Sequence, residues 1–221
     1  MIIGAMDYSI SKPGLCKFIL DNNLDIEEKY YLTMTETKKY ERKDCVIHYN
    51  TKKDFIDDIE RKLWVEEEIF NFLNNCDYVA LEGYAFAAKG LIFDIAEGCG
   101  IAKRRLYKRG IKLRIYDPSS IKKFATNMGN ADKIHMEEDY EKCIDKFDLS
   151  FLPMVREGKS GNPKDNVVDA FFICKLLQLE LKIRHGLILL KDLDLKKIEI
   201  FNKVSKKYPE SLLTRSFIER R

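Results

Sequence analysis

Three acidic residues stand out in the sequence because each follows an apolar segment or lies inside one. Asp7 follows IIGAM, Glu82 follows YVAL, and Asp169 lies within VVDAFF. A carboxylate buried without a partner is costly, so such acids are either paired or bind a ligand. Asp7 and Glu82 end segments that we expect to be strands, and ligands bind at that edge of open α/β sheets. For each acid taken alone, an N-cap or a buried salt bridge is the alternative interpretation.

Carboxylates gathered at one sheet edge favour a divalent cation. Their oxygens are hard ligands, and Mg²⁺ prefers them together with water and substrate phosphate. Two such ions about 3.5–4 Å apart can hold both the attacking water and the leaving oxygen of a phosphodiester. The three histidines are far apart and the cysteines form no CxxC pair, so neither supplies a competing site. The residues therefore predict Mg²⁺ chemistry, without choosing phosphodiester hydrolysis over other Mg²⁺-dependent reactions.

The hydrophobic pattern predicts the elements that must position these acids. We expect strands over 2–8, 15–20, 28–34, 78–82 and 111–116, and helices over 51–73, 91–108 and 165–184. Asp117 and Pro118 offer an N-cap and a first-turn proline for a further helix. This order predicts an α/β fold with a mixed sheet flanked by helices, in which an antiparallel meander precedes parallel strands.

Length, composition and charge limit the class of protein. The chain has 221 residues, 45% hydrophobic and 34% charged, which excludes a disordered or low-complexity chain. We expect no membrane span and no signal peptide, because no apolar run reaches about 18 residues and the start lacks a basic region before an apolar one. Six dispersed cysteines lead us to expect a reducing, intracellular compartment. A net charge of +3 permits nucleic-acid binding without implying it.

Four segments, in order, resemble the RuvC family of Holliday junction resolvases in its phage and large-virus branch. They are IIGAMDYSISKPGLC (2–16), VALEGYAF (79–86), YDPSSIKKFATNMGNADK (116–133) and PKDNVVDAFFICKLL (163–177). The resemblance implies an RNase H-like nuclease domain over 1–185, followed by a C-terminal helical extension over 186–221 that the short bacterial enzymes lack. It further implies a homodimer that resolves four-way or branched DNA with Mg²⁺, two ions per site, for which Mn²⁺ can substitute.

The resemblance also implies roles for individual residues. Asp7, Glu82 and Asp169 fall on catalytic, metal-binding carboxylates, and Lys122 falls on a catalytic lysine. An ammonium group near the scissile phosphate can stabilise the charge that develops in the transition state. We expect DNA contacts from Ser9, Tyr84, Phe86, Lys123, Lys133, Arg156, Lys159 and Lys164. Tyr84 and Phe86 could stack on an unpaired base, but they could equally be core residues.

The start of the last long helix departs from the family pattern. The family usually carries an acid, or sometimes His, three residues before the last Asp, where this chain has Asn166 preceded by Asp165. Both residues neighbour Asp169 on a helix surface, so both are candidate ligands. An amide oxygen can bind Mg²⁺ but adds no charge. We therefore expect Asn166 to weaken the second metal site, with Asp165 either an N-cap or the missing carboxylate.

Other functions remain compatible with these residues. Within the same class, the chain could be an RNase H-like nuclease that acts on flaps or RNA–DNA hybrids. From other classes, it could be a catalytically weak junction-binding protein, or a phosphotransferase that uses the same acids on ATP. No second glycine-rich phosphate loop supports the last of these.

Overall fold

A six-stranded mixed sheet forms the centre of the protein. The structure is a computed structural model, and it describes residues 1–42, 47–83, 92–152 and 163–207. The strands are β1 (Ile2–Asp7), β2 (Gly14–Leu20), β3 (Ile26–Thr35), β4 (Ile47–Tyr49), β5 (Tyr78–Glu82) and β6 (Lys112–Tyr116). Their order is β4-β3-β2-β1-β5-β6. The β1-β2-β3 meander is antiparallel, and β5 and β6 continue the sheet parallel to β1. The mixed sheet that the pattern predicts is thus confirmed.

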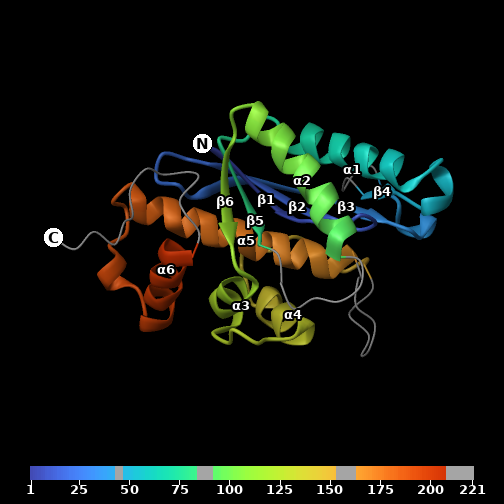
Figure 1. Cartoon of the computed structure of the whole chain (residues 1–221). Coiled ribbons are helices and arrows are strands. Elements are labelled where there is room, and N and C mark those ends of the chain that lie inside the picture. The colour runs from blue at the N-terminus through green and yellow to red at the C-terminus, as the bar shows by residue number, and fades with distance from the viewer. Residues whose placement is uncertain (43–46, 84–91, 153–162, 208–221) are drawn as a thin grey trace.

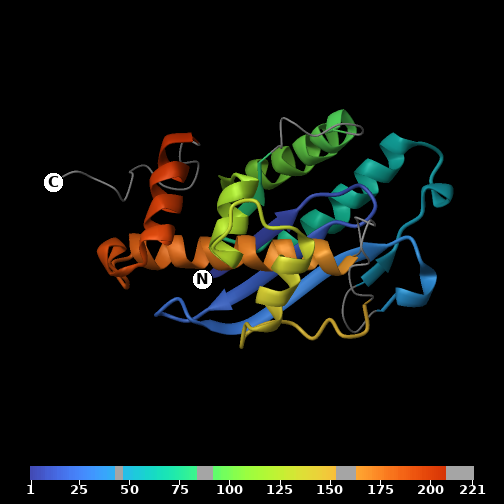
Figure 2. The same cartoon turned by 90° about the horizontal axis from the view of Figure 1, so that it is seen from below.

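Helices cover both faces of this sheet. They are α1 (Asp58–Leu73), α2 (Ile92–Lys108), α3 (Pro118–Thr126), α4 (Lys133–Glu141), α5 (Pro163–Arg184) and α6 (Leu195–Lys207). Short 3₁₀ turns occur at η1 (Lys38–Tyr40), η2 (Lys52–Asp54) and η3 (Leu190–Asp192). Helices α1 and α2 lie on one face of the sheet, and the long α5 crosses the other (Figures 1 and 2). Helices α3 and α4 pack against each other and against α5.

The alternation of side chains along β1 and β5 decides which face each acid uses. Ile3 and Ala5 of β1 and Ala80 of β5 belong to the core between the sheet and α5. Met6 and Leu81 belong to the opposite core, under α1 and α2. Because successive side chains of a strand point to opposite faces, the next residues, Asp7 and Glu82, point to the α5 side. The alternating hydrophobic pattern therefore places both acidic side chains on the face of the sheet covered by α5, the helix that carries Asp169.

A glycine allows α5 to approach the sheet closely. A Cβ atom added at Gly14, the first residue of β2, would lie 1.9 Å from the main-chain oxygen of Asn166. No side chain fits at that distance, so this position requires glycine. The contact brings the N-terminal turn of α5, with its acidic residues, to the edge of the sheet where β1 ends.

The observed elements differ from the sequence prediction at the start of α1 and at β4, and α4 was not among the predicted helices. The helix expected over 51–73 begins only at Asp58, because the Asp57 side chain caps it by accepting a hydrogen bond from the Glu60 N–H at 2.7 Å. The preceding residues form η2, and Ile56, which fits the helical pattern, is 92% exposed. Strand β4 was not expected, because three residues at a sheet edge are too short to give a periodic signal.

No helix in the described part of the chain is both long enough and apolar enough to cross a membrane.

Candidate active site

Asp7 and Glu82 end two adjacent parallel strands at the same level. Met6 of β1 pairs with Leu81 of β5, so the next residue on each strand is one of the two acids. Neighbouring strands lie about 4.8 Å apart, which brings the two carboxylates to one place at the carboxyl edge of the sheet. Both side chains are half-buried. The two acids singled out as strand ends are therefore neighbours in space.

Helix α5 adds two further carboxylates from its first two turns. Asp165 and Asp169 are four residues apart, so they lie on the same side of the helix. They are only 4% and 8% exposed, respectively, and α5 packs directly against β1 and β2. Asp165 is the third residue of α5, inside the first turn rather than at a cap position. The sequence prediction that Asp165 could be an N-cap is not met in this structure.

Electrostatic interactions tie these acids into one cluster. Burial raises the pKa of Asp7 well above its ordinary value, and the charges of Asp169, Glu82 and Asp165 raise it further. Burial, followed by the charge of Asp169, raises the pKa of Glu82 to about 7. Such mutual effects require the carboxylates to lie near one another in a poorly solvated place. We call Asp7, Glu82, Asp165 and Asp169 the acidic cluster.

Two lysines provide positive charge at the acidic cluster. Lys133, the first residue of α4, donates a hydrogen bond from its ammonium group to Asp169. Burial alone would lower the pKa of Lys133, but the charges of Asp169 and Asp7 raise it above its ordinary value. The charge of Lys122 of α3 lowers the pKa of Glu82, so its ammonium group lies within electrostatic range of the cluster. Among the described residues, that group has no hydrogen bond or ion pair.

The donor set of the acidic cluster suits a hard cation. Its side chains offer only carboxylate oxygens, the ligands that Mg²⁺ prefers. Within the described ranges, no three or more His, Cys, Asp or Glu side chains are gathered closely enough to hold a metal ion. Lys133 instead supplies the countercharge to Asp169. The carboxylate oxygens are suitable ligands for Mg²⁺, and the acids influence one another electrostatically. In the described residues, however, their side chains do not converge on one point at coordination distance.

Asn166 has a structural partner in the turn between β1 and β2. Its side-chain amide donates a hydrogen bond to the main-chain carbonyl oxygen of Lys12. Asp165, by contrast, contributes to the pKa shifts of both Asp7 and Lys133. Of the two candidates for a fourth ligand, Asp165 is therefore the one that is electrostatically coupled to the acidic cluster.

The residues expected to contact DNA fall into different surroundings. The Ser9 hydroxyl accepts a hydrogen bond from the Lys12 N–H at 3.3 Å and so stabilises the turn after β1. Lys123 pairs with Glu199 of α6. Lys164 is only 4% exposed and pairs with Glu137 and Glu141 of α4, an arrangement that does not present it to DNA. Tyr84, Phe86, Arg156 and Lys159 lie outside the described residues.

Sequence reasoning missed one polar group beside the acidic cluster. Asp117, at the end of β6, was expected only to cap α3, which it does by accepting a hydrogen bond from the Ser120 N–H. Its carboxylate also pairs with Lys203 of α6, at 2.8 Å. Nothing in the sequence links residues 86 positions apart, because α6 has no motif of its own.

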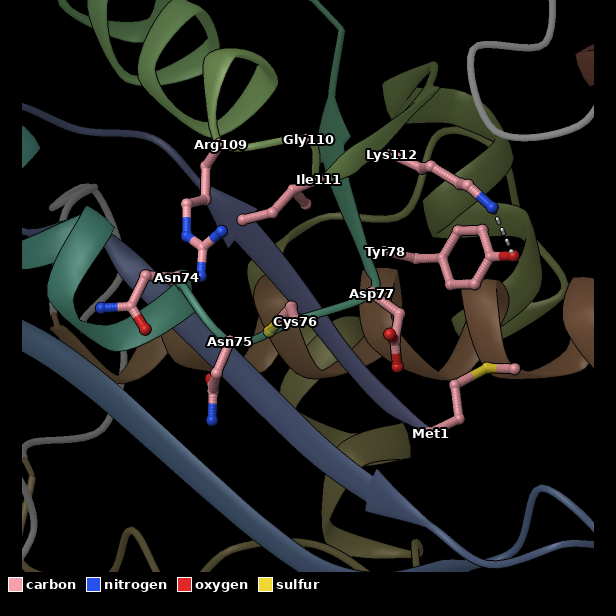
Figure 3. Close-up of a pocket in the computed structure, with 10 residues that line it drawn as sticks. All are labelled: Met1, Asn74, Asn75, Cys76, Asp77, Tyr78, Arg109, Gly110, Ile111 and Lys112. Carbon is pink, nitrogen blue, oxygen red and sulfur yellow. Dashed lines mark hydrogen bonds between the residues drawn. The ribbon is translucent and has the colours of Figure 1, made fainter.

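A separate pocket of about 450 Å³ lies at the opposite edge of the sheet (Figure 3). It is lined by Met1, Asn74–Tyr78 and Arg109–Lys112, where β5 and β6 begin. The Lys112 ammonium points to the Tyr78 hydroxyl, at 3.4 Å. Helices α1 and α2 end there, and Arg109 at the end of α2 matches the negative end of the helix dipole. The pocket therefore lies where two helices end and two strands begin, at the edge of the sheet opposite the acidic cluster.

Comparisons with known proteins identify the fold. No family model matches the sequence, and no curated protein matches it. Among solved structures, Thermus thermophilus RuvC in complex with a Holliday junction substrate matches with a TM-score of 0.52 and 15% identity, over 85% of this chain and 97% of that one. Another structure of T. thermophilus RuvC matches with a TM-score of 0.50 and 14% identity, over 84% and 97%.

The Fowlpox virus resolvase, in a complex with Holliday junction DNA, matches with a TM-score of 0.50 and 16% identity. That match covers 82% of this chain and 99% of the viral one. The RNase H-like architecture that the four sequence segments imply is thus confirmed. The chain has the RuvC-type fold of Holliday junction resolvases.

Proposed function

We propose that this protein is a Mg²⁺-dependent endonuclease that resolves four-way or branched DNA by paired phosphodiester hydrolysis. One observation carries the proposal: acids from β1, β5 and α5 gather at the carboxyl edge of the parallel strands, with two lysines beside them. Proteins that share this fold have been solved with Holliday junction DNA. The acidic cluster and the fold thus point to the same class of reaction.

Each residue of the site has a part in the proposed mechanism. Asp7, Glu82, Asp165 and Asp169 would hold Mg²⁺, with Mn²⁺ as a substitute. When bound, two such ions activate the attacking water and neutralise the leaving oxygen. Lys122 lies within electrostatic range of Glu82 and has no ion pair in the part of the chain that the structure describes, so its charge is available to the phosphate where negative charge develops. Lys133 holds Asp169 in place and balances the charge of the cluster.

We further propose that the protein acts as a homodimer, because a four-way junction has two-fold symmetry and needs two nicks. Exposed apolar side chains on α1 and α2 support this proposal: Ile59 is 61%, Leu63 50% and Phe93 86% exposed. Lys62 of α1 joins the two helices by pairing with Asp94 and Glu97 of α2. Apolar patches of this kind commonly mark interfaces. We propose that two copies meet there.

A cleavage assay on a synthetic four-way junction tests the proposed function. We expect paired, symmetric nicks in Mg²⁺ and little cleavage in Ca²⁺, whose looser coordination does not hold an in-line geometry. The Asp7→Asn and Glu82→Gln variants serve as controls, since each should abolish nicking while junction binding persists. Nicking by either variant at the wild-type rate would contradict the site.

The same assay separates the alternatives when flap and RNA–DNA hybrid substrates run beside the junction. Cleavage confined to flaps or hybrids would assign the protein to a related RNase H-like nuclease. Tight, salt-sensitive junction binding without any nicking would assign it to a junction-binding protein.

A further inference from the structure

We propose that helix α6 of the C-terminal extension positions α3 for catalysis, and that Lys203 does so by neutralising Asp117 beside the acidic cluster. This inference rests on the proposed nuclease function, because the residue to be positioned is Lys122 of α3. It assigns a part in the reaction to a segment that the resemblance leaves without one.

Asp117 is an additional acid next to the acidic cluster. It follows Tyr116, which pairs with Glu82 in the parallel register of β5 and β6. The N–H of Gly83, the residue after Glu82, donates a hydrogen bond to the Tyr116 carbonyl oxygen at 2.7 Å. This bond holds the ends of β5 and β6 together. The charge of Asp117 is among those that raise the pKa of Glu82, after burial and Asp169. Asp117 thus adds negative charge where an anionic phosphate must arrive.

The Asp117 carboxylate is buried and held by four donors. It is 2% exposed. It accepts hydrogen bonds from the Ser119 hydroxyl at 2.6 Å, from the N–H of Ser120 at 3.1 Å and from the Ser120 hydroxyl at 2.7 Å. The fourth donor is the Lys203 ammonium at 2.8 Å, which also reaches the Ser119 hydroxyl at 2.5 Å. Burial alone would raise the pKa of Asp117, but these donors, Lys203 first, lower it to about 2.

Lys203 is the cation that balances this charge. Ser119 and Ser120 are neutral donors, so they satisfy the oxygens of Asp117 without cancelling its charge. Without Lys203, the negative charge would remain beside Glu82. It would repel the phosphate and attract Lys122, the nearby lysine that has no ion pair among the described residues. Lys203 therefore keeps Lys122 available to the phosphate.

A second contact fixes α6 on α3. Glu199 and Lys203 are four residues apart and lie on one side of α6. Glu199 pairs with Lys123 of α3, while Lys203 pairs with the N-cap of the same helix. Ile200 and Phe201 are buried in the core that also holds Ile121 of α3. Helix α6 lies next to α3 (Figure 1), and two ion pairs at different points of α3, with an apolar contact between them, fix the position of α3 and hence of Lys122.

Substitution of Lys203 tests the inference in the full-length protein. Lys203→Met keeps most of the side-chain volume and removes the charge. We expect the single-turnover nicking rate at saturating enzyme to fall about tenfold, while the junction Kd changes less than about twofold. Lys196→Met is the matched control, because Lys196 is an exposed lysine of the same helix whose side chain has no partner among the described residues. This control should nick at the wild-type rate.

Two rescue variants separate charge neutralisation from a structural role. Lys203→Arg should retain most of the rate, because it keeps the charge. In the Lys203→Met background, Asp117→Asn should restore the rate, since Asn still caps α3 but leaves no charge to neutralise. A rate unchanged in Lys203→Met would overturn the inference. So would a junction affinity that falls in proportion to the rate, which would make Lys203 a DNA contact, or a double variant as slow as the single one.

A readout without DNA keeps this inference distinct from the proposed function. Amide hydrogen exchange over residues 118–126 should be faster in Lys203→Met than in Lys196→Met, because α3 has lost one of its two ion pairs with α6 and its N-cap Asp117 is left buried without a countercharge. If the wild type nicks no substrate, the proposed function fails, and the exchange experiment still decides whether α6 positions α3. Equal exchange in the two variants would overturn the positioning role.

Discussion

The side-chain amide of Asn166 donates a hydrogen bond to the main-chain carbonyl oxygen of Lys12, at the turn between β1 and β2. Its neighbour Asp165 is instead coupled to Asp7 and Lys133. The family pattern points to Asn166 as a weak ligand, whereas this hydrogen bond favours Asp165 as the fourth carboxylate. The two assignments give opposite mutational results.

We predict that Asp165→Asn lowers nicking at limiting Mg²⁺ by at least about tenfold, because it removes a charge from the acidic cluster. Asn166→Asp should not raise activity. It would set a carboxylate against the Lys12 carbonyl oxygen and destabilise the protein by about 1–3 kcal/mol. Mg²⁺ titrations of the nicking rate and urea unfolding measure the two effects. An active, stable Asn166→Asp variant with a lower Mg²⁺ requirement would favour the family position instead.

We predict that the metal-free protein becomes less stable as the pH rises from about 4.5 to about 7 through the titration of Glu82. Burial and Asp169 raise the folded-state pKa of Glu82 to about 7, above its ordinary value of 4.5. The unfolded chain therefore releases this proton first, and the folded state loses stability across that interval. Glu82→Gln should flatten this dependence by up to about 3 kcal/mol, measured by urea unfolding at several pH values. An equally steep profile in the variant would assign the dependence to other groups.

We predict that Lys122→Ala slows the chemical step by about 10²-fold and changes junction affinity little. Its charge acts on Glu82 and its ammonium group has no partner among the described residues, so under the proposed mechanism it interacts mainly with the transition state. Single-turnover rates and binding isotherms separate the two effects. Lys108→Ala is the control, because this exposed lysine ends α2, close to the pocket at the other edge of the sheet. A defect in Lys122→Ala that excess enzyme corrects would make Lys122 a phosphate contact.

We predict that Phe93→Glu converts the proposed dimer to a monomer. Phe93 is 86% exposed, and a charge there would have to be desolvated in an apolar interface. Sedimentation equilibrium measures the change. Ile144→Glu is the control, since Ile144 is fully exposed in the segment after α4, away from α1 and α2. If both variants sediment as the wild type does, the two copies do not meet at α1 and α2.

We predict that Gly14→Ala and Gly100→Ala have opposite effects on stability. A Cβ atom at Gly14 would overlap the main chain of Asn166, which should cost about 2–4 kcal/mol and displace the acids of α5. Gly100 lies within α2 with nothing within 4 Å of an added Cβ, so alanine there should stabilise by up to about 1 kcal/mol. Thermal unfolding distinguishes the two. A neutral Gly14→Ala would mean that α5 does not approach β2 so closely.

The sequence alone predicted most of the elements and the acids that the structure gathers into the acidic cluster. Alternation in IIGAM and YVAL placed two acids at strand ends, because a half-buried strand repeats every two residues. The apolar run around Asp169 predicted a buried helix that carries an acid. These features are local, so they can be found within a few neighbouring residues. The start of α1 could not be found in this way, because a cap at Asp57 overrides a pattern that continues upstream.

Only the tertiary structure decided which acids and bases meet. The parallel register sets Asp7 beside Glu82, and the contact at Gly14 brings Asp165 and Asp169 to them. The buried pairing of Lys164 with Glu137, and of Asp117 with Lys203, depends on helices that lie far apart in the chain. The sequence does not distinguish a lysine that contacts DNA from one that pairs with a buried carboxylate. The difference is its surroundings in three dimensions, which set its solvation and its partners.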